Sequence, residues 1–289
     1  MSRDHLVAIL EAFFVTFLWS SSYVLVKVGL KEMSPLSLVA LRYVVASLIL
    51  LPLALRRGEG EFLRDSRNVG KMVALGLSGY TVAQGLQCLG LFYLPAVSVT
   101  FILNFTPLIV AVLGVVALKE YPRLHQLAGM CLVLAGAYLY FNAPLMGDSL
   151  LGVVITLISG MGWGSYLVLG RLLFVRGELN PLGLTAFSMG FGTLLLALVA
   201  FSMEGFPSVS LTGWGIILWL GVVNTALAFF LWNHALQRLE AFEISVLQNT
   251  MLVQIALLSW MFLGESLTLA KLIPMALVFV GALVVQMRR

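Results

Sequence analysis

The stretch AVSVTFILNFTPLIVAVLGVVALKE at residues 96–120 decides the fold, because it has a counterpart in AFEISVLQNTMLVQIALLSWMFLGE at residues 241–265. Each stretch begins with alanine, carries asparagine at the same place and ends with glutamate. Asn104 therefore matches Asn249 about 145 positions later. Two apolar halves related in this way are typical of membrane transporters that are built from internal repeats.

Further pairs extend the repeat over both halves of the chain, with one or two residues of slippage near the start of each half. These pairs are Leu132 and Leu277, Gly136 and Gly281, Trp19 to Tyr23 and Trp163 to Tyr166, and Ser34-Pro35-Leu36 and Asn180-Pro181-Leu182. The sequence therefore predicts one repeat over residues 1–142 and a second over residues 150–289.

The composition places the chain in a lipid bilayer, since 61% of its residues are hydrophobic, 10% are charged and its mean hydropathy is +1.03. About 20 helical residues cross the roughly 30 Å of hydrocarbon, and the polar breaks leave segments of this size. Helices are expected near residues 6–28, 35–55, 71–93, 96–118, 123–141, 150–172, 182–203, 213–237, 241–263 and 269–287. The expected fold class is an all-α integral membrane protein with about ten transmembrane helices in two five-helix repeats.

The positions of lysine and arginine predict the orientation. With the N-terminus inside, the cytoplasmic flanks collect Arg3, Arg56, Arg57, Arg64, Arg67, Lys71, Lys119, Arg123, Arg171, Arg176, Arg238, Arg288 and Arg289. The other flanks receive Lys27, Lys31 and Lys271. We expect a multi-pass protein of the cell (inner) membrane with both termini cytoplasmic and no cleaved signal. Because each repeat has an odd number of helices, the two repeats are expected to have inverted topology.

The motifs also resemble the EamA branch of the drug/metabolite transporter superfamily. The matching pieces are the Trp19 and Trp163 turns, Pro35 with Leu41-Arg42-Tyr43, Thr106-Pro107 with Glu120, Leu263-Gly264-Glu265, and Gly129 with Gly136. This resemblance implies a central cavity lined mainly by helices 1, 3, 4, 6, 8 and 9, and export of small organic molecules by alternating access. Leu252 stands where the first repeat has Pro107, so the ninth helix is expected to bend less than the fourth.

Polar residues at mid-membrane depth predict the binding site, because such groups must be paired, packed inward or facing water. Asn104 and Asn249 are a pair at equivalent positions, with hydrogen bonding between helices as the alternative role. A polar stripe in the third helix and an aromatic counterpart in the eighth add further candidates. The candidate substrate-binding residues are Trp19, Tyr23, Tyr80, Gln84, Gln87, Asn104, Trp163, Tyr166, Trp232 and Asn249. Additional polar candidates are Asn224, Asn233, His234 and Gln254.

Charged residues inside the spans are few. Glu11 is the candidate for coupling transport to protons, while Arg42 is expected to have a structural role. Glu120 and Glu265 precede the fifth and tenth helices, and we expect them to cap those helices. His234 is expected to be solvated or capping.

The residues favour a secondary-active transporter over an enzyme, a channel or a lipid scramblase. No catalytic constellation, metal site or cofactor motif is visible, and Cys88 and Cys131 lie in different spans. The expected substrate is a small neutral or zwitterionic metabolite such as an amino acid, with lipophilic cations or drugs as the alternative. The expected partners are that small molecule and the bilayer, without nucleic acid, for a monomer or weak homodimer.

Overall fold

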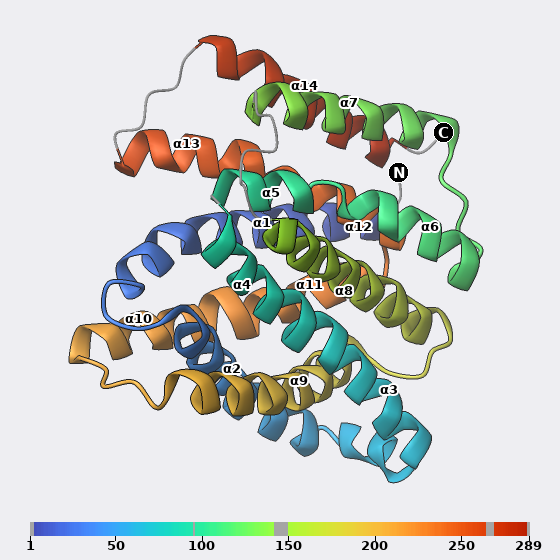
Figure 1. The fold of residues 1–289 in the computed structure, drawn as a ribbon. Coiled ribbons are helices and arrows are strands. Elements are labelled where there is room, and N and C mark those ends of the chain that lie inside the picture. The colour runs from blue at the N-terminus through green and yellow to red at the C-terminus, as the bar shows by residue number, and fades with distance from the viewer. Residues whose placement is uncertain (1–2, 95, 142–149, 264–268, 288–289) are drawn as a thin grey trace.

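The computed structural model describes residues 3–94, 96–141, 150–263 and 269–287, and within these ranges the chain forms helices and no strands. Seven of the described helical segments are long and apolar enough to cross a membrane, and two shorter apolar helices span Leu124–Tyr140 and Leu272–Gln286. The helices pack side by side in a bundle (Figure 1). The expectation of an all-helical, multi-pass membrane protein is thereby confirmed.

Several expected helices are made of two or three pieces. The elements of the first half are α1 (Arg3–Gly29), α2 (Pro35–Arg56), η1 (Glu59–Arg64), α3 (Ser66–Gly76), η2 (Leu77–Gly85), α4 (Leu86–Tyr93), α5 (Ala96–Leu103), α6 (Thr106–Leu118) and α7 (Leu124–Phe141). Those of the second half are α8 (Leu150–Val175), α9 (Pro181–Glu204), α10 (Leu211–Gly221), η3 (Val222–Leu227), α11 (Ala228–Leu236), α12 (Ala241–Gln248), α13 (Met251–Leu263) and α14 (Leu269–Gln286).

Two π-helical segments, η2 and η3, interrupt the third and the eighth expected helices at matching places in the two halves. Within η3 the side-chain hydroxyl of Thr225 donates to the carbonyl of Leu220, five residues earlier, at 2.8 Å. Such segments are uncommon and occur frequently at functional sites.

The fourth and ninth expected helices both break near their middle. At the first break the amide of Phe105 donates to the carbonyl of Ile102 at 3.1 Å, and at the second Thr250 donates to Leu247 at 3.0 Å. These are tight turns with bonds over three residues. Because the break is present beside Leu252 as well as beside Pro107, proline alone does not explain it. We expected the ninth helix to bend less than the fourth, but both helices break at equivalent positions.

The α2 and α9 helices are antiparallel neighbours that are tied at both ends. Glu204 at the end of α9 accepts from the main-chain amide of Ser37 at 2.8 Å and from its hydroxyl at 2.9 Å. At the other end, Glu59 accepts from the side-chain amide of Asn180 at the start of α9. Carboxylates are favourable at both helix N-termini because of the unpaired amides and the helix dipole.

The α7 and α14 helices approach closely at glycine. A Cβ atom built on Gly129 would lie 2.6 Å from the carbonyl oxygen of Gly281, and one built on Gly136 would lie 2.7 Å from that of Pro274. These glycines allow the two backbones to touch, as small residues do in membrane bundles.

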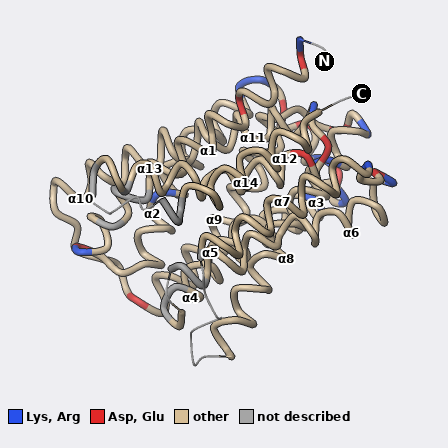
Figure 2. The backbone as a smooth tube through the Cα atoms, turned by 90° about the horizontal axis from the view of Figure 1, so that it is seen from above, with Lys and Arg blue, Asp and Glu red and all other residues tan. Residues whose placement is uncertain are grey.

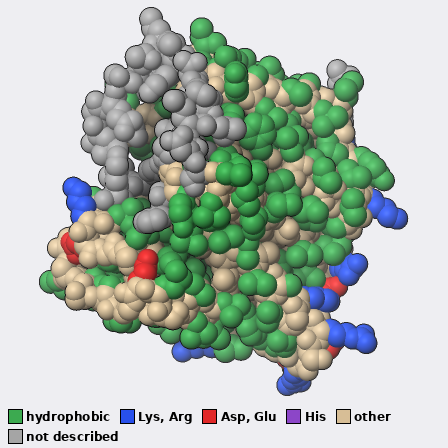
Figure 3. Space-filling model, viewed as in Figure 1, with side chains coloured by type: hydrophobic (Ala, Val, Ile, Leu, Met, Phe, Trp, Pro, Cys, Tyr) green, Lys and Arg blue, Asp and Glu red, His purple; other side chains and the backbone are tan. Residues whose placement is uncertain are grey.

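The surface of the bundle is apolar on its flank and charged at one end. Large apolar side chains such as Leu48, Val116 and Leu198 are exposed, and a wide hydrophobic face is visible in Figure 3. Most lysines and arginines gather at the end where both chain termini lie, and few lie at the other end (Figure 2). This distribution is the one that membrane orientation rules associate with a cytoplasmic face.

Candidate functional site

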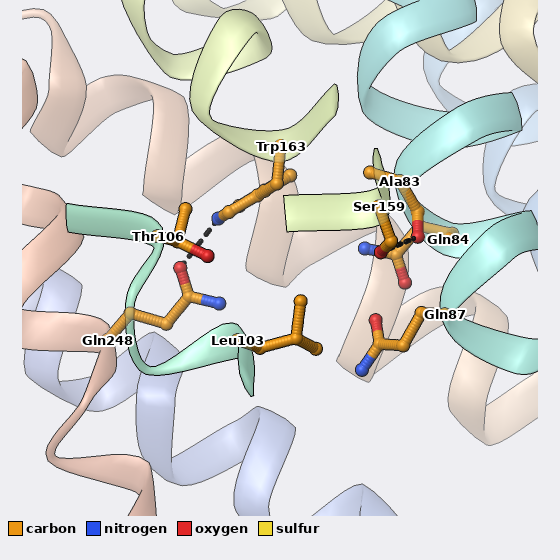
Figure 4. Close-up of a pocket in the computed structure, with 8 residues that line it drawn as sticks. All are labelled: Ala83, Gln84, Gln87, Leu103, Thr106, Ser159, Trp163 and Gln248. Atoms are coloured by element: carbon orange, nitrogen blue, oxygen red, sulfur yellow. Dashed lines mark hydrogen bonds between the residues drawn. The ribbon is translucent and has the colours of Figure 1, made fainter. Parts of the chain in front are cut away.

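A cavity lies inside the bundle where the η2–α4 rod meets α8 and the breaks of the fourth and ninth helices (Figure 4). It encloses about 290 Å³ of empty space, counting the part that opens to solvent. The lining residues are Ala83, Gln84, Gln87, Leu103, Thr106, Ser159, Trp163 and Gln248.

The lining is polar but uncharged. Gln84 and Gln87 lie one helical turn apart, and neither side-chain amide has a hydrogen-bond partner among the residues that the structure describes. Across the cavity Gln248 accepts a hydrogen bond from the indole nitrogen of Trp163 at 2.6 Å, and Ser159 donates to the carbonyl of Ala83 at 2.6 Å. Unpaired amides offer both donors and acceptors to a polar ligand.

An aromatic cluster adjoins the cavity and shares Trp163 with it. The rings of Trp19 and Trp232 lie 4.8 Å apart, and those of Trp19 and Phe229 lie 5.2 Å apart. Trp163 stacks on Tyr166 at 5.2 Å, and Tyr166 hydrogen-bonds to Tyr80 through the two hydroxyl groups at 3.0 Å. The cluster fills the space beside the cavity and forms part of the largest hydrophobic core.

Asn104 and Asn249 lie at the two helix breaks, next to the cavity-lining residues Leu103 and Gln248. The side-chain amide of Asn249 donates to the main-chain carbonyl of Asn104 at 3.1 Å. The side-chain amide of Asn104 instead donates within its own helix, to the carbonyl of Thr100 at 2.8 Å. Both side chains are buried, and neither lines the cavity.

The structure thus divides the candidate residues into groups. Gln84, Gln87 and Trp163 line the cavity; Trp19, Tyr80, Tyr166 and Trp232 belong to the aromatic cluster; Asn104 and Asn249 join the helix breaks. The side chain of Tyr23 lies outside the described residues. Gln248, Thr106 and Ser159 were not predicted, although the place of Gln248 beside Asn249 at mid-span was a usable signal.

The remaining polar candidates make hydrogen bonds inside the bundle. Asn233 donates to the hydroxyl groups of Tyr166 and Thr185 at 2.7 and 2.9 Å. The main-chain carbonyl of Asn224 accepts from the indole of Trp19 at 3.1 Å. Further bonds join Gln254 to Ser20 at 3.0 Å and to Thr16 at 2.9 Å.

Glu11 and His234 form a pair between α1 and α11, with the carboxylate 2.7 Å from the imidazole Nδ1. Arg238 lies beside the same ring, its Nη1 2.8 Å from Nε2 of His234. The side chains of Glu11 and His234 are 21% and 29% exposed, so water reaches both of them. His234 is therefore partly exposed to water and also pairs with Glu11.

Glu120 does not cap the helix that follows it, contrary to expectation. Its carboxylate accepts from the main-chain amide of Ala241, at the start of α12, at 3.2 Å and pairs with Arg171 of α8 at 3.1 Å. Lys119, with φ of 58°, turns the chain sharply just before Glu120. This left-handed residue directs Glu120 toward the other half instead of toward α7. The corresponding Glu265 lies outside the described residues.

The remaining residues that the sequence singled out are Arg42 and the two cysteines. Arg42 lies with its guanidinium 5.1 Å from the ring centre of Tyr43, a cation–π contact. Cys88 and Cys131 are free thiols. Among the described residues, no three His, Cys, Asp or Glu side chains lie close enough to hold a metal ion.

Comparison with known proteins gives one family. The model of the EamA-like transporter family matches residues 6–142 and 150–287. An uncharacterized transporter of Archaeoglobus fulgidus is 28% identical over 258 residues, which cover 85% of this chain and 84% of that protein. A probable amino-acid metabolite efflux pump of Salmonella typhimurium is 24% identical over 93% of this chain and 91% of the pump.

Two further matches come from a shorter alignment and from a solved structure. An S-adenosylmethionine/S-adenosylhomocysteine transporter of Chlamydia muridarum is 31% identical over 54% of this chain and 52% of that protein. A crystal structure superposes with a TM-score of 0.81 at 21% identity, covering 96% of this chain and 95% of the other. The match to the crystal structure concerns the fold alone. The relatives from Archaeoglobus fulgidus, Salmonella typhimurium and Chlamydia muridarum are all named as transporters or pumps and not as enzymes.

Proposed function

The chain belongs to the EamA-like transporter family, and we propose that it is a secondary-active carrier that exports a small neutral or zwitterionic metabolite, such as an amino acid, by alternating access. The observation that carries this proposal is the cavity, which has an uncharged polar lining and an aromatic wall. Ligand sites of this kind combine large apolar surfaces with a few polar anchors. The cavity residues that we assign to substrate binding are Gln84, Gln87, Trp163 and Gln248.

The uncharged lining of the cavity favours substrates without a net charge. None of the eight side chains that line the cavity is ionised, so a compound with several negative charges would be bound there without counter-charges. A zwitterion has no net charge, and glutamine amides can donate to its carboxylate and accept from its ammonium group. The printed name of the Salmonella typhimurium relative, a probable amino-acid metabolite efflux pump, supports the same class.

The carrier that we propose has ten transmembrane helices in two repeats of inverted topology. Reciprocal contacts support this arrangement, because Glu204 caps α2 while Glu59 lies at the start of α9. Ser47 donates to its counterpart Thr193 at 3.1 Å, 146 positions later. The matching π segments and matching helix breaks are a further support. Odd-membered repeats give such a carrier two related half-structures that can exchange conformations.

We propose that the protein lies in the inner membrane and that both of its termini are in the cytoplasm. It is supported by the gathering of lysines and arginines at the end of the bundle that holds both termini (Figure 2). The cavity lining belongs to helix breaks and helix interiors, as expected for a binding site near the membrane centre.

Lipophilic cations are the second candidate substrate class. The aromatic cluster and the carboxylate of Glu11 are the observations that favour it, since aromatic faces attract cations. A channel or a lipid scramblase differs in kinetics, because a carrier saturates and exchanges its substrate across the membrane.

Purified protein in proteoliposomes tests the proposal. We expect saturable uptake and counterflow of at least one labelled amino acid in a screen that includes quaternary amines. Gln84→Leu and Gln87→Leu should raise the Km by about tenfold, the effect of losing one hydrogen bond to a polar ligand. Saturable transport of quaternary amines alone would favour the second candidate. Flux that neither saturates nor shows counterflow would overturn the proposal.

A further inference from the structure

Residues of the aromatic cluster and residues of the cavity occupy equivalent positions in the two repeats. The repeat places Phe229 at the position of Gln84, Trp232 at the position of Gln87, and Trp19 at the position of Trp163. Gln84 lies in the π segment η2 and Gln87 follows it in α4, while Phe229 and Trp232 follow the π segment η3. The two half-structures therefore present different chemistry at corresponding places.

The space in the second half is filled by its own side chains. Phe229 and Trp232 are 1% and 0% exposed, and the ring of Trp19 lies within 5.2 Å of both. On the side of the first half, the corresponding space is the cavity that Gln84 and Gln87 line. The space beside Gln84 and Gln87 is thus left unfilled, whereas the corresponding space beside Phe229 and Trp232 is filled by side chains.

The indole nitrogen of Trp232 is buried and has no hydrogen-bond partner in the described structure. Buried indole N–H groups usually find an acceptor, and one without a partner destabilises the packing around it. A ligand with an acceptor atom between these rings would satisfy this donor. The unpaired nitrogen is an observation independent of the repeat, and it points to the same place.

Trp163 connects the cavity to the cluster. Its indole nitrogen donates to Gln248 across the cavity, while its ring centre lies 6.1 Å from Trp19, 6.0 Å from Phe229 and 6.4 Å from Trp232. One side chain therefore forms a wall of both spaces, and a substrate that passes from one to the other moves past it.

We infer that Trp19, Phe229 and Trp232 form a second substrate subsite, collapsed in this structure and open when the carrier faces the cytoplasm. This inference rests on the proposed function. The subsite binds the large apolar side chain of a zwitterionic substrate between the rings, and the Trp232 indole donates to an acceptor of the substrate. The glutamines of the cavity bind the polar head group in the opposite, outward-facing state. The substrate class is then a zwitterion with a bulky apolar side chain.

The test measures Km on each face of the membrane in right-side-out and inside-out vesicles, with phenylalanine, leucine and alanine as probes. Trp232→Phe keeps a six-membered aromatic ring and removes the N–H group together with the rest of the five-membered ring. We expect it to raise the phenylalanine Km at the cytoplasmic face by about tenfold and to change that at the external face by less than about twofold. Gln87→Leu, the matched change in the first half, should show the reverse sidedness.

The probes add a second readout. In the wild type, phenylalanine and leucine should have a lower cytoplasmic Km than alanine, and Trp19→Ala should reduce that preference. Ligand-induced increases in melting temperature, measured on the same variants, separate loss of folding from loss of binding. Equal changes at both faces, or no change for Trp232→Phe, would overturn the subsite. A wild-type protein that transports none of the three probes would instead overturn the proposed amino-acid function, and the subsite with it.

Discussion

The side-chain amide of Asn249 donates a hydrogen bond to the main-chain carbonyl of Asn104 at 3.1 Å, and so joins the two helix breaks across the halves of the chain. The two residues are 145 positions apart and stand at equivalent places in the repeat. The bond is not reciprocal, since the Asn104 side chain is used within its own helix. The symmetry of the sequence is therefore broken at the centre of the bundle.

Asn249→Leu is expected to lower the free energy of unfolding by about 1 kcal/mol, because it leaves the buried carbonyl of Asn104 without this donor. Asn104→Leu keeps that carbonyl and should have a smaller effect. Melting temperature in detergent and transport kinetics of both variants provide the measurement. A raised Km at unchanged stability would instead assign the two asparagines to substrate binding.

Glu120→Gln is expected to destabilise the protein by about 1–3 kcal/mol, because Arg171 and the first amide of α12 lose a charged acceptor. The pH optimum of transport should not move. Glu61→Gln is the matched control, since Glu61 belongs to an exposed ion pair with Arg64 at 3.6 Å. A shifted pH profile with normal stability for Glu120→Gln would contradict the structural role.

Gly281→Ala is expected to reduce stability by about 1–3 kcal/mol, because its new Cβ would lie 2.5 Å from the carbonyl oxygen of Gly129. Gly114→Ala in α6 is the control, because nothing lies within 4 Å of the Cβ position there. The control should be neutral or stabilising, as alanine favours helices. Equal melting temperatures for the two variants would show that α7 and α14 do not need this contact.

Glu11→Gln is expected to abolish any stimulation of export by a proton gradient while counterflow continues, if Glu11 is the coupling residue. His234→Gln retains the carboxylate and removes its partner at 2.7 Å, so the stimulation should be altered but not lost. Both are measured in proteoliposomes with and without an imposed gradient. An unchanged response in Glu11→Gln excludes this residue as the coupling site.

Reporter fusions are expected to place both termini and residues 57–70 in the cytoplasm, and residues 142–149 and 204–212 outside. The reason is the distribution of lysine and arginine, which does not depend on the substrate. Impermeant labelling of single cysteines in the same loops gives an independent measurement. Opposite sides for residues 142–149 and 204–212 would contradict the inverted repeat.

The sequence was sufficient for the fold class, because apolar span length and the placement of basic residues follow from the bilayer itself. It did not predict the break at Asn249, because no proline marks that place in the sequence. The bond that joins the two breaks, from the Asn249 side chain to the carbonyl of Asn104, connects residues 145 positions apart. The role of Glu120 at the start of α12 was also missed, because a capping prediction from sequence considers only the helix that follows directly.

The candidate site was predicted in part. Gln84 and Gln87 were found because polar side chains one turn apart inside a span are rare, and both line the cavity. The sequence could not decide whether Trp19 and Trp232 line an open cavity or pack in a closed cluster, because a tryptophan at these positions gives the same sequence pattern in both cases. The packing distances, which depend on the conformation of the whole bundle, decide between the two.

The carboxylate of Glu204 at the start of α2 has a consequence for biosynthesis. Ser34 and Glu204 are 170 positions apart, so α2 leaves the ribosome long before its capping carboxylate exists. At translation rates of about 5–20 residues per second, the delay is about 10–30 s. During this interval the N-terminus of α2 depends on water or lipid head groups for its hydrogen bonds. The start of α2 is consequently capped only after α9 has been made.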